Sequence, residues 1–134
     1  MAKYIALNYN TFFVGGIMEN LYYSITLFFT IYLLYFLIIV CSKKRLNKYK
    51  KSTEVLYLTY KYKIDINNYN IKKVANLLAI SNAFILSSIF FISCYIENIF
   101  LKFLVVFALV FAFIILIYGV VGNELSKGLF KEKR

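Results

Sequence analysis

Three long apolar runs, separated by one long polar stretch, define the pattern of this chain. Residues 21–41, 71–96 and 99–121 each have roughly the twenty mostly apolar residues that an α-helix needs to cross a bilayer core. The stretch between the first two runs is polar and basic. We therefore predict an all-α integral membrane protein with three transmembrane helices. The tight turn Glu97-Asn98 would join the last two as a C-terminal helical hairpin.

The same pattern divides the chain into an N-terminal segment, one membrane domain and a tail. Residues 1–20 are expected outside the cytoplasm, 21–122 form a single three-helix domain, and 123–134 form a cytoplasmic tail. Gly15-Gly16 predicts a loop before the first span. A secretory signal peptide is a poorer interpretation, because the basic cluster follows the first apolar run and no small-residue cleavage site is present. Met18 is an alternative start to Met1.

Composition supports the membrane interpretation. The 134 residues are 62% hydrophobic with a mean hydropathy of +0.72, which is more apolar surface than a soluble domain of this length could bury. The net charge is +10. The basic residues lie beside the apolar runs and no nucleic-acid-binding motif is present, so anionic lipid headgroups are the expected partner and nucleic acid is not.

The basic residues of the polar stretch 42–70 and of the start of the next run predict the orientation. Positive charge stays on the cytoplasmic side, which places this stretch in the cytoplasm, the N-terminus and the 97–98 turn outside, and the tail inside. The expected location is the plasma membrane. The residues predicted to contact lipid headgroups or a cytoplasmic partner are Lys43, Lys44, Arg45, Lys48, Lys50, Lys51, Tyr57, Lys61, Lys63, Lys72 and Lys73.

A short amphipathic helix is predicted inside the polar stretch. Ser52 can cap it, Glu54 suits its first turn, and it would end near Lys63. Its apolar side favours a helix lying on the membrane surface, and a solvated linker is the alternative. The turn 65–70 begins like a calcium loop but lacks the glycine and the closing glutamate, so we predict no metal there.

Small residues at helical spacing predict how the second and third spans pack. If the hairpin is centred between residues 97 and 98, two residues at equal depth have numbers that sum to 195. Ala83 then faces Ala112, Ser87 faces Ala108, and Asn76 faces Gly119. Asn82 is predicted to point inward, toward Thr30 or Tyr32 of the first span. The predicted helix-packing residues are Ala75, Ala79, Asn82, Ala83, Ser87, Ala108, Ala112 and Gly119.

Catalytic chemistry is not indicated. The chain has no His, and all six carboxylates are expected in loops or at membrane interfaces. No span contains a base next to a nucleophile, so we predict a protein that is not an enzyme and has no cofactor. Cys41 and Cys94 are expected at opposite membrane faces as inert thiols, with lipidation of Cys41 as the alternative.

Part of the polar stretch resembles a known kind of protein. The residues are Lys51-Ser52-Thr53-Glu54-Val55, Tyr57-Leu58, Lys61-Tyr62-Lys63-Ile64-Asp65 and Asn68-Tyr69. They resemble small three-span membrane proteins of unknown function from low-GC Gram-positive bacteria. The resemblance covers residues 21–122 and implies no activity or site.

The layout is also similar to small members of the YidC-type membrane-insertase superfamily, with an outside N-terminus, a cytoplasmic segment and a two-span hairpin. The cytoplasmic segment is too short for that family's coiled coil, and no basic residue lies deep in a span. The preferred prediction is therefore a non-enzymatic subunit or assembly factor of a membrane complex, with a membrane-protein partner or self-association. An insertase-like protein is the first alternative, and a holin-like pore former the second.

Overall fold

The computed structural model describes the backbone of residues 2–132 and the side chains of residues 14–132, and it is all-helical. Five α-helices carry the fold, with one π-helix and one short 3-10 helix between them. In chain order the elements are α1 (Ala2–Tyr35), the π-helix η1 (Phe36–Val40), α2 (Lys43–Tyr49), α3 (Thr53–Tyr62), the 3-10 helix η2 (Ile66–Asn68), α4 (Ile71–Ser93) and α5 (Ile99–Ser126).

Three helical segments are long and apolar enough to cross a membrane, as the sequence predicts. They are Val14–Val40, Ile71–Ser93 and Ile99–Ser126. The predicted loop at Gly15-Gly16 is wrong, because α1 runs through both residues without a break. A glycine inside a helix costs only about 1 kcal/mol relative to alanine, which the surrounding helical turns can offset.

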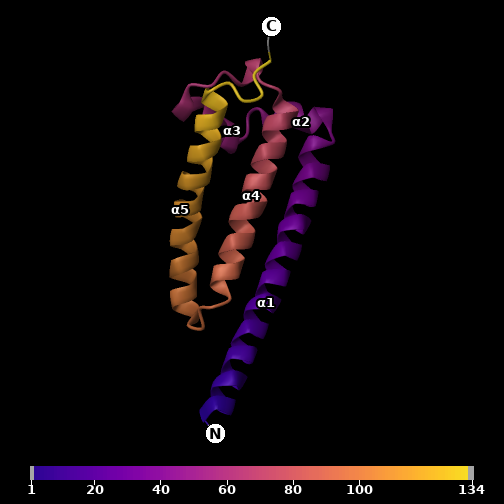
Figure 1. The fold of residues 1–134 in the computed structure, drawn as a ribbon. Helices are drawn as coiled ribbons and strands as arrows, with labels where there is room; N and C mark the ends of the chain where they lie inside the picture. Colours follow the sequence, from indigo (N-terminus) through magenta and orange to yellow (C-terminus); the bar gives the residue numbers. More distant parts are fainter. Residues whose placement is uncertain (1, 133–134) are drawn as a thin grey trace.

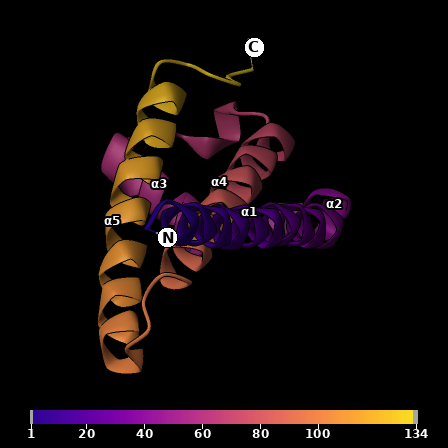
Figure 2. The same ribbon diagram turned by 60° about the horizontal axis from the view of Figure 1, so that its bottom comes forward.

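The helix α4 lies between α1 and α5 (Figure 1). The N-terminal part of α1 extends past the connection between α4 and α5, so this part has no helix beside it (Figure 1). The helices α2 and α3, together with the C-terminal tail, gather at the opposite end, which we call the α3 end. Figure 2 shows α3 beside α5 in a second view, in agreement with the contacts between these two helices.

The main apolar core lies at the α3 end, because α3 is buried against the long helices. Its Val55 and Leu58 are 0% and 1% exposed, and Leu78 of α4 and Leu125 of α5 are fully buried beside them. The opposite side of α3 faces outward, with Tyr60 90% exposed. The predicted bounds of this helix are confirmed: the Ser52 hydroxyl accepts from the Val55 N–H, and Lys63 ends the helix in the left-handed conformation.

The turn after α3 pairs with the C-terminal tail. The Asn70 N–H donates to the Phe130 carbonyl at 3.0 Å, and the Glu132 N–H donates to the Asn68 carbonyl at 2.9 Å. The Tyr69 hydroxyl donates to the buried Leu125 carbonyl at 2.9 Å. The turn that resembles a calcium loop therefore connects the start of α4 to the end of α5 through hydrogen bonds.

The predicted pairing of small residues between the second and third spans is wrong. Ala75, Ala79, Ala83 and Ser87 of α4 are buried, but Ala108 and Ala112 of α5 are exposed. The Ser87 carbonyl accepts from Ser24 of α1 at 3.1 Å, so this side of α4 packs against α1. Equal depth fixes the height of two residues but not the rotation of each helix about its axis. The larger side chains of α5, such as Val106 and Phe113, face the core, where they make more van der Waals contact than alanine would.

Candidate functional site

A carboxylate is carried into the helix bundle by α3. Glu54 lies in the first turn of this helix, directly before the buried Val55. Because Val55 and Leu58 anchor α3 against α4 and α5, the Glu54 side chain is held half-buried between the long helices. The sequence pattern that caps α3 and buries one side of it therefore also places an acidic group inside an apolar bundle.

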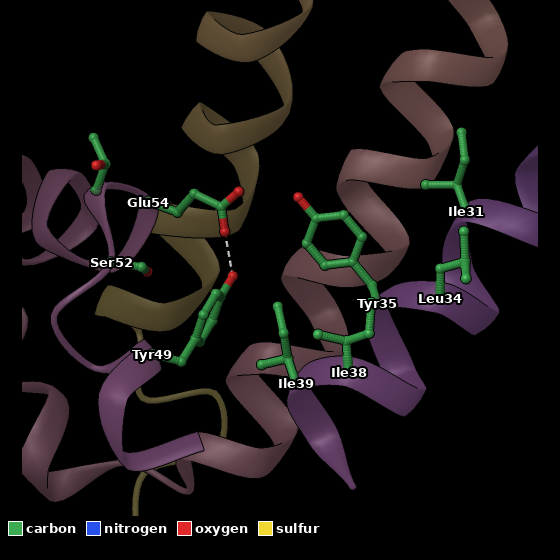
Figure 3. A pocket seen from close by; sticks show the side chains of 9 residues that line it. Ile31, Leu34, Tyr35, Ile38, Ile39, Tyr49, Ser52 and Glu54 are labelled. Atoms are coloured by element: carbon green, nitrogen blue, oxygen red, sulfur yellow. Dashed lines mark hydrogen bonds between the residues drawn. The ribbon is translucent and has the colours of Figure 1, made fainter. Parts of the chain in front are cut away.

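One polar residue from each of the five α-helices meets at this point. We call Tyr35, Tyr49, Glu54, Asn82 and Tyr118 the Glu54 cluster. The Tyr49 hydroxyl donates to Oε2 of Glu54, and the Asn82 side-chain amide donates to Oε1 at 2.7 Å. The Tyr118 hydroxyl donates to Oδ1 of Asn82 at 2.9 Å. Tyr35 points its hydroxyl toward the same carboxylate (Figure 3).

The cluster solvates the carboxylate with neutral donors. Tyr49 and Asn82 donate directly, and Tyr118 fixes the Asn82 amide so that its nitrogen faces Glu54. Among the side chains of residues 14–132, the ion pair found is between Lys127 and Glu124 on the surface, so no described Lys or Arg neutralises Glu54. Burial, followed by the hydrogen bond to Glu54 and its negative charge, raises the pKa of Tyr49. Tyr49 therefore remains a protonated donor at neutral pH.

The cluster lies well inside the apolar helices. Asn82 follows the α4 cap Asn70 by twelve residues, which corresponds to roughly 18 Å along the helix. Tyr118 precedes the end of α5 by eight residues, which corresponds to roughly 12 Å. The prediction that all six carboxylates lie in loops or at membrane interfaces stays a prediction for Glu54, which is half-buried in the first turn of α3.

A cavity of about 470 Å³ adjoins the Glu54 cluster. One wall is mostly apolar and comes from α1 and the π-helix, and the other is polar and comes from the end of α2 and the start of α3 (Figure 3). Leu34 and Ile38 are 53% and 49% exposed, so the cavity is open at its side. The lining residues are Ile31, Leu34, Tyr35, Ile38, Ile39, Tyr49, Ser52, Thr53 and Glu54.

The predicted headgroup contacts lie mostly at the surface of the protein. All the named basic residues are exposed except Lys50, which is half-buried. Arg45 donates to the Ile38 carbonyl at 3.3 Å, which ties the basic segment to the cavity wall. Tyr57 is half-buried: it accepts from Lys61 at 2.7 Å and packs edge-on against Tyr118, at 6.2 Å between ring centroids. Tyr57 therefore contributes to packing as well as to the surface.

The predicted inward direction of Asn82 is confirmed, but its predicted partners are wrong. The Thr30 hydroxyl donates to the Thr26 carbonyl within α1, at 2.8 Å. The Tyr32 hydroxyl donates to Asn76, at 3.0 Å. Gly119, predicted to face Asn76, lies instead against Tyr62 of α3. No local sequence pattern indicates the register between α3 and the spans, so Glu54 and Tyr118 could not be predicted as the partners of Asn82.

The sequence indicates that two tyrosines of the cluster need hydrogen-bond partners, but it does not identify those partners. Tyr35 lies deep in the first span, where a hydroxyl needs a hydrogen-bond partner. Tyr118 lies in the third span and has the same requirement, but its position alone does not identify the helix that it faces. Tyr49 precedes the capped helix by a few residues, and nothing in the local pattern separates it from the other tyrosines of the polar stretch.

Metal chemistry has no candidate ligand set here: the described residues contain no group of three or more acidic, Cys or His side chains placed to hold an ion. No protein-family model, curated protein or solved structure matches this chain. The geometry of the Glu54 cluster and its cavity is therefore the basis for assigning a function.

Proposed function

We propose that this protein is a non-enzymatic subunit or assembly factor that binds a membrane-embedded segment of a partner protein in the cavity beside Glu54. The observation that carries this proposal is an open cavity with an apolar wall and a hydrogen-bonded carboxylate at its inner end, inside an apolar bundle. Polar groups facing lipid without a partner are costly, so a site of this kind is stabilised when another segment covers it.

The orientation belongs to the same proposal. The protein would span the plasma membrane with its N-terminus outside and its C-terminus in the cytoplasm. In this arrangement α4 and α5 form a transmembrane hairpin, and α2 with the outer side of α3 lies at the cytoplasmic interface. The exposed basic residues from Lys43 to Lys51 would contact anionic headgroups, which keeps the cavity at the inner side of the membrane.

Cysteine accessibility tests this orientation. Variants that keep only Cys41 or only Cys94 would be treated with a membrane-impermeant maleimide in intact and in opened cells. We expect Cys41, which is exposed, to react only after the cells are opened, and the half-buried Cys94 to react from outside, more slowly. The reverse pattern would contradict the proposed topology.

Photo-crosslinking in native membranes tests the partner-binding function. A benzophenone amino acid at Leu34 or Ile38 would lie at the open side of the cavity, and one at Ile115 would lie on an exposed part of α5 as the matched control. We expect discrete protein adducts from the two cavity positions and none of the same size from the control. Identical products from cavity and control positions, or no protein adduct from the cavity, would contradict the proposal.

An insertase-like function is the second candidate, and the polar wall of the cavity is the observation that favours it. The cavity lies between α1 and the basic segment, where an incoming segment could pass from the cytoplasm toward lipid. The charged group beside this cavity is acidic, whereas the resemblance to the insertase superfamily leads one to expect a basic residue deep in a span. Depletion of the protein should then slow the insertion of newly made membrane proteins, and ribosomes or translocon components should co-purify with it. A normal insertion rate after depletion would leave the subunit function as the better account.

A further inference from the structure

We propose that the cavity selects a transmembrane segment that carries a lysine or arginine, whose cation pairs with the Glu54 carboxylate. This inference rests on the proposed function, because it names the chemistry of the segment that the cavity would receive.

The Glu54 carboxylate has free acceptor positions. An ionised carboxylate offers about four lone-pair sites, and the bonds from Tyr49 and Asn82 occupy one on each oxygen. Both donors are neutral, so the cluster stabilises the anion without cancelling it. A cationic side chain entering the cavity would therefore find an acceptor that is already oriented, and charge-assisted hydrogen bonds are the strong ones.

The chain does not supply this cation from the part that the structure describes. Ten of its Lys and Arg residues lie between residues 43 and 73, yet the ion pair found among the described side chains is Lys127 with Glu124 on the surface. Arg45, the basic residue tied to the cavity wall, donates to the Ile38 carbonyl and not to Glu54. A half-buried carboxylate without a cationic partner can accept an ion pair, and an incoming cation would supply that partner.

The cavity wall fits a helix that bears such a side chain. The apolar wall runs from Ile31 to Ile39, which corresponds to roughly 12 Å or two helical turns. Its last part is the π-helix Phe36–Val40, a local widening that is frequent at functional sites. An apolar helix can pack its side chains on this wall, while the aliphatic stem of one lysine crosses the cavity toward Glu54.

Depth favours a transmembrane segment over a lipid amine. Asn82, which binds Glu54, lies roughly 18 Å along α4 from the helix start, and Tyr118 lies roughly 12 Å from the end of α5. In the proposed orientation, headgroup amines stay at the membrane surface, whereas a basic residue within a span can reach the depth of the cluster. Such a residue is also poorly tolerated in lipid, so it gains most from a carboxylate.

Synthetic transmembrane peptides test the inference. The purified protein, with a benzophenone at Ile38, would be placed in phosphatidylcholine vesicles with a leucine–alanine helix that carries one lysine roughly 12 to 18 Å from its cytoplasmic end. The matched peptides have leucine or glutamate at that position. We expect the lysine peptide to bind about tenfold more tightly than the leucine peptide, and the glutamate peptide to bind most weakly.

Variants of the protein separate charge recognition from stability. Glu54→Gln keeps an acceptor for Asn82 but removes the charge, so it should abolish the lysine preference, and Glu54→Asp should retain part of it. Glu124→Gln removes a surface carboxylate paired with Lys127 and should leave the preference unchanged. Thermal melting of each variant identifies any that fails to fold. If Glu54→Gln does not fold, the comparison of lysine, leucine and glutamate peptides on the unmodified carboxylate still decides the question.

Three results would overturn the inference: equal binding of the lysine and leucine peptides, a lysine preference that persists in folded Glu54→Gln, or loss of the preference when phosphatidylethanolamine is added. The last result would assign the carboxylate to lipid amines. Equal binding of the peptides together with discrete native adducts at Ile38 would remove charge selection but leave the proposed partner binding intact. The absence of native adducts at Ile38 would instead remove the proposed function.

Discussion

Replacing Asn82 by leucine should destabilise the protein much more than the same replacement at Asn76. Both amides are half-buried on α4, so the two substitutions are matched in helix, chemistry and exposure. Asn82 donates to the Glu54 carboxylate at 2.7 Å and accepts from the Tyr118 hydroxyl at 2.9 Å. Asn76 accepts one neutral bond, from Tyr32 at 3.0 Å.

The magnitudes follow from the kind of bond that is lost. A hydrogen bond to a charged group contributes about 1.5–3 kcal/mol and a neutral one about 0.5–1.5 kcal/mol. Bonds between membrane helices average only about 0.6 kcal/mol, so we take the lower part of the summed range. We expect Asn82→Leu to lower the free energy of unfolding by about 2–3 kcal/mol, because it also leaves the Tyr118 hydroxyl buried without its acceptor. Asn76→Leu should lower it by about 0.6–1.5 kcal/mol.

Both losses of unfolding free energy can be measured by unfolding each variant in mixed micelles with increasing amounts of a denaturing detergent, with helix content as the signal. A double-mutant cycle that combines Asn82→Leu with Glu54→Ala should show a coupling energy of at least about 1 kcal/mol, because either substitution removes the bond that the two residues share. The reasoning is refuted if Asn76→Leu costs as much as Asn82→Leu. It is also refuted if the cycle is additive within about 0.3 kcal/mol, since independent sites behave in that way.

Three further predictions concern Tyr49 and the ends of α3. The pKa of Tyr49 is raised above its ordinary 10.0, so its contribution to stability is present below pH 10 and is lost as the pH rises further; Tyr49→Phe should flatten this alkaline loss in a pH series of melts. Gly122→Ala should weaken the packing of α3 by about 1–3 kcal/mol, because a Cβ at residue 122 would overlap the Tyr62 ring. Gly119→Ala is the control, because its Cβ would meet the Tyr62 hydroxyl at an ordinary 3.7 Å. Hydrogen exchange of the α3 amides should therefore increase only in Gly122→Ala. Lys63→Gly should raise the melting temperature through a gain of about 1 kcal/mol, because residue 63 ends α3 at φ 52°, and an unchanged or lower value would argue against strain there.

The pattern of residues identified the helices more reliably than their contacts. The apolar runs predicted three membrane-length helices, and Ser52 with Glu54 predicted the start of α3, because span length and capping depend on residues close in sequence. The loop predicted at Gly15-Gly16 was wrong for a local reason. Glycine lowers helix propensity, but the apolar residues on both sides continue one helix through it.

Contacts between helices could not be obtained from the same local rules. Ala108 and Ala112 have the spacing of a packing face, yet α5 is rotated so that both are exposed. A single sequence sets which sides of a helix are small or large, but the rotation that is adopted minimises the free energy of all helices together. The predicted partners of Asn82 failed for this reason, while its inward direction, which depends only on polarity, was correct.

The sequence by itself determined that the chain is a set of apolar helices around one basic polar stretch. Only the tertiary structure decided that this stretch does more than connect two spans. Burial of Val55 and Leu58 draws α3 into the bundle and carries Glu54 with it to Asn82 and Tyr118. The cluster and its cavity depend on contacts between five helices that are far apart in sequence, and such contacts follow from packing of the whole fold and not from any local pattern.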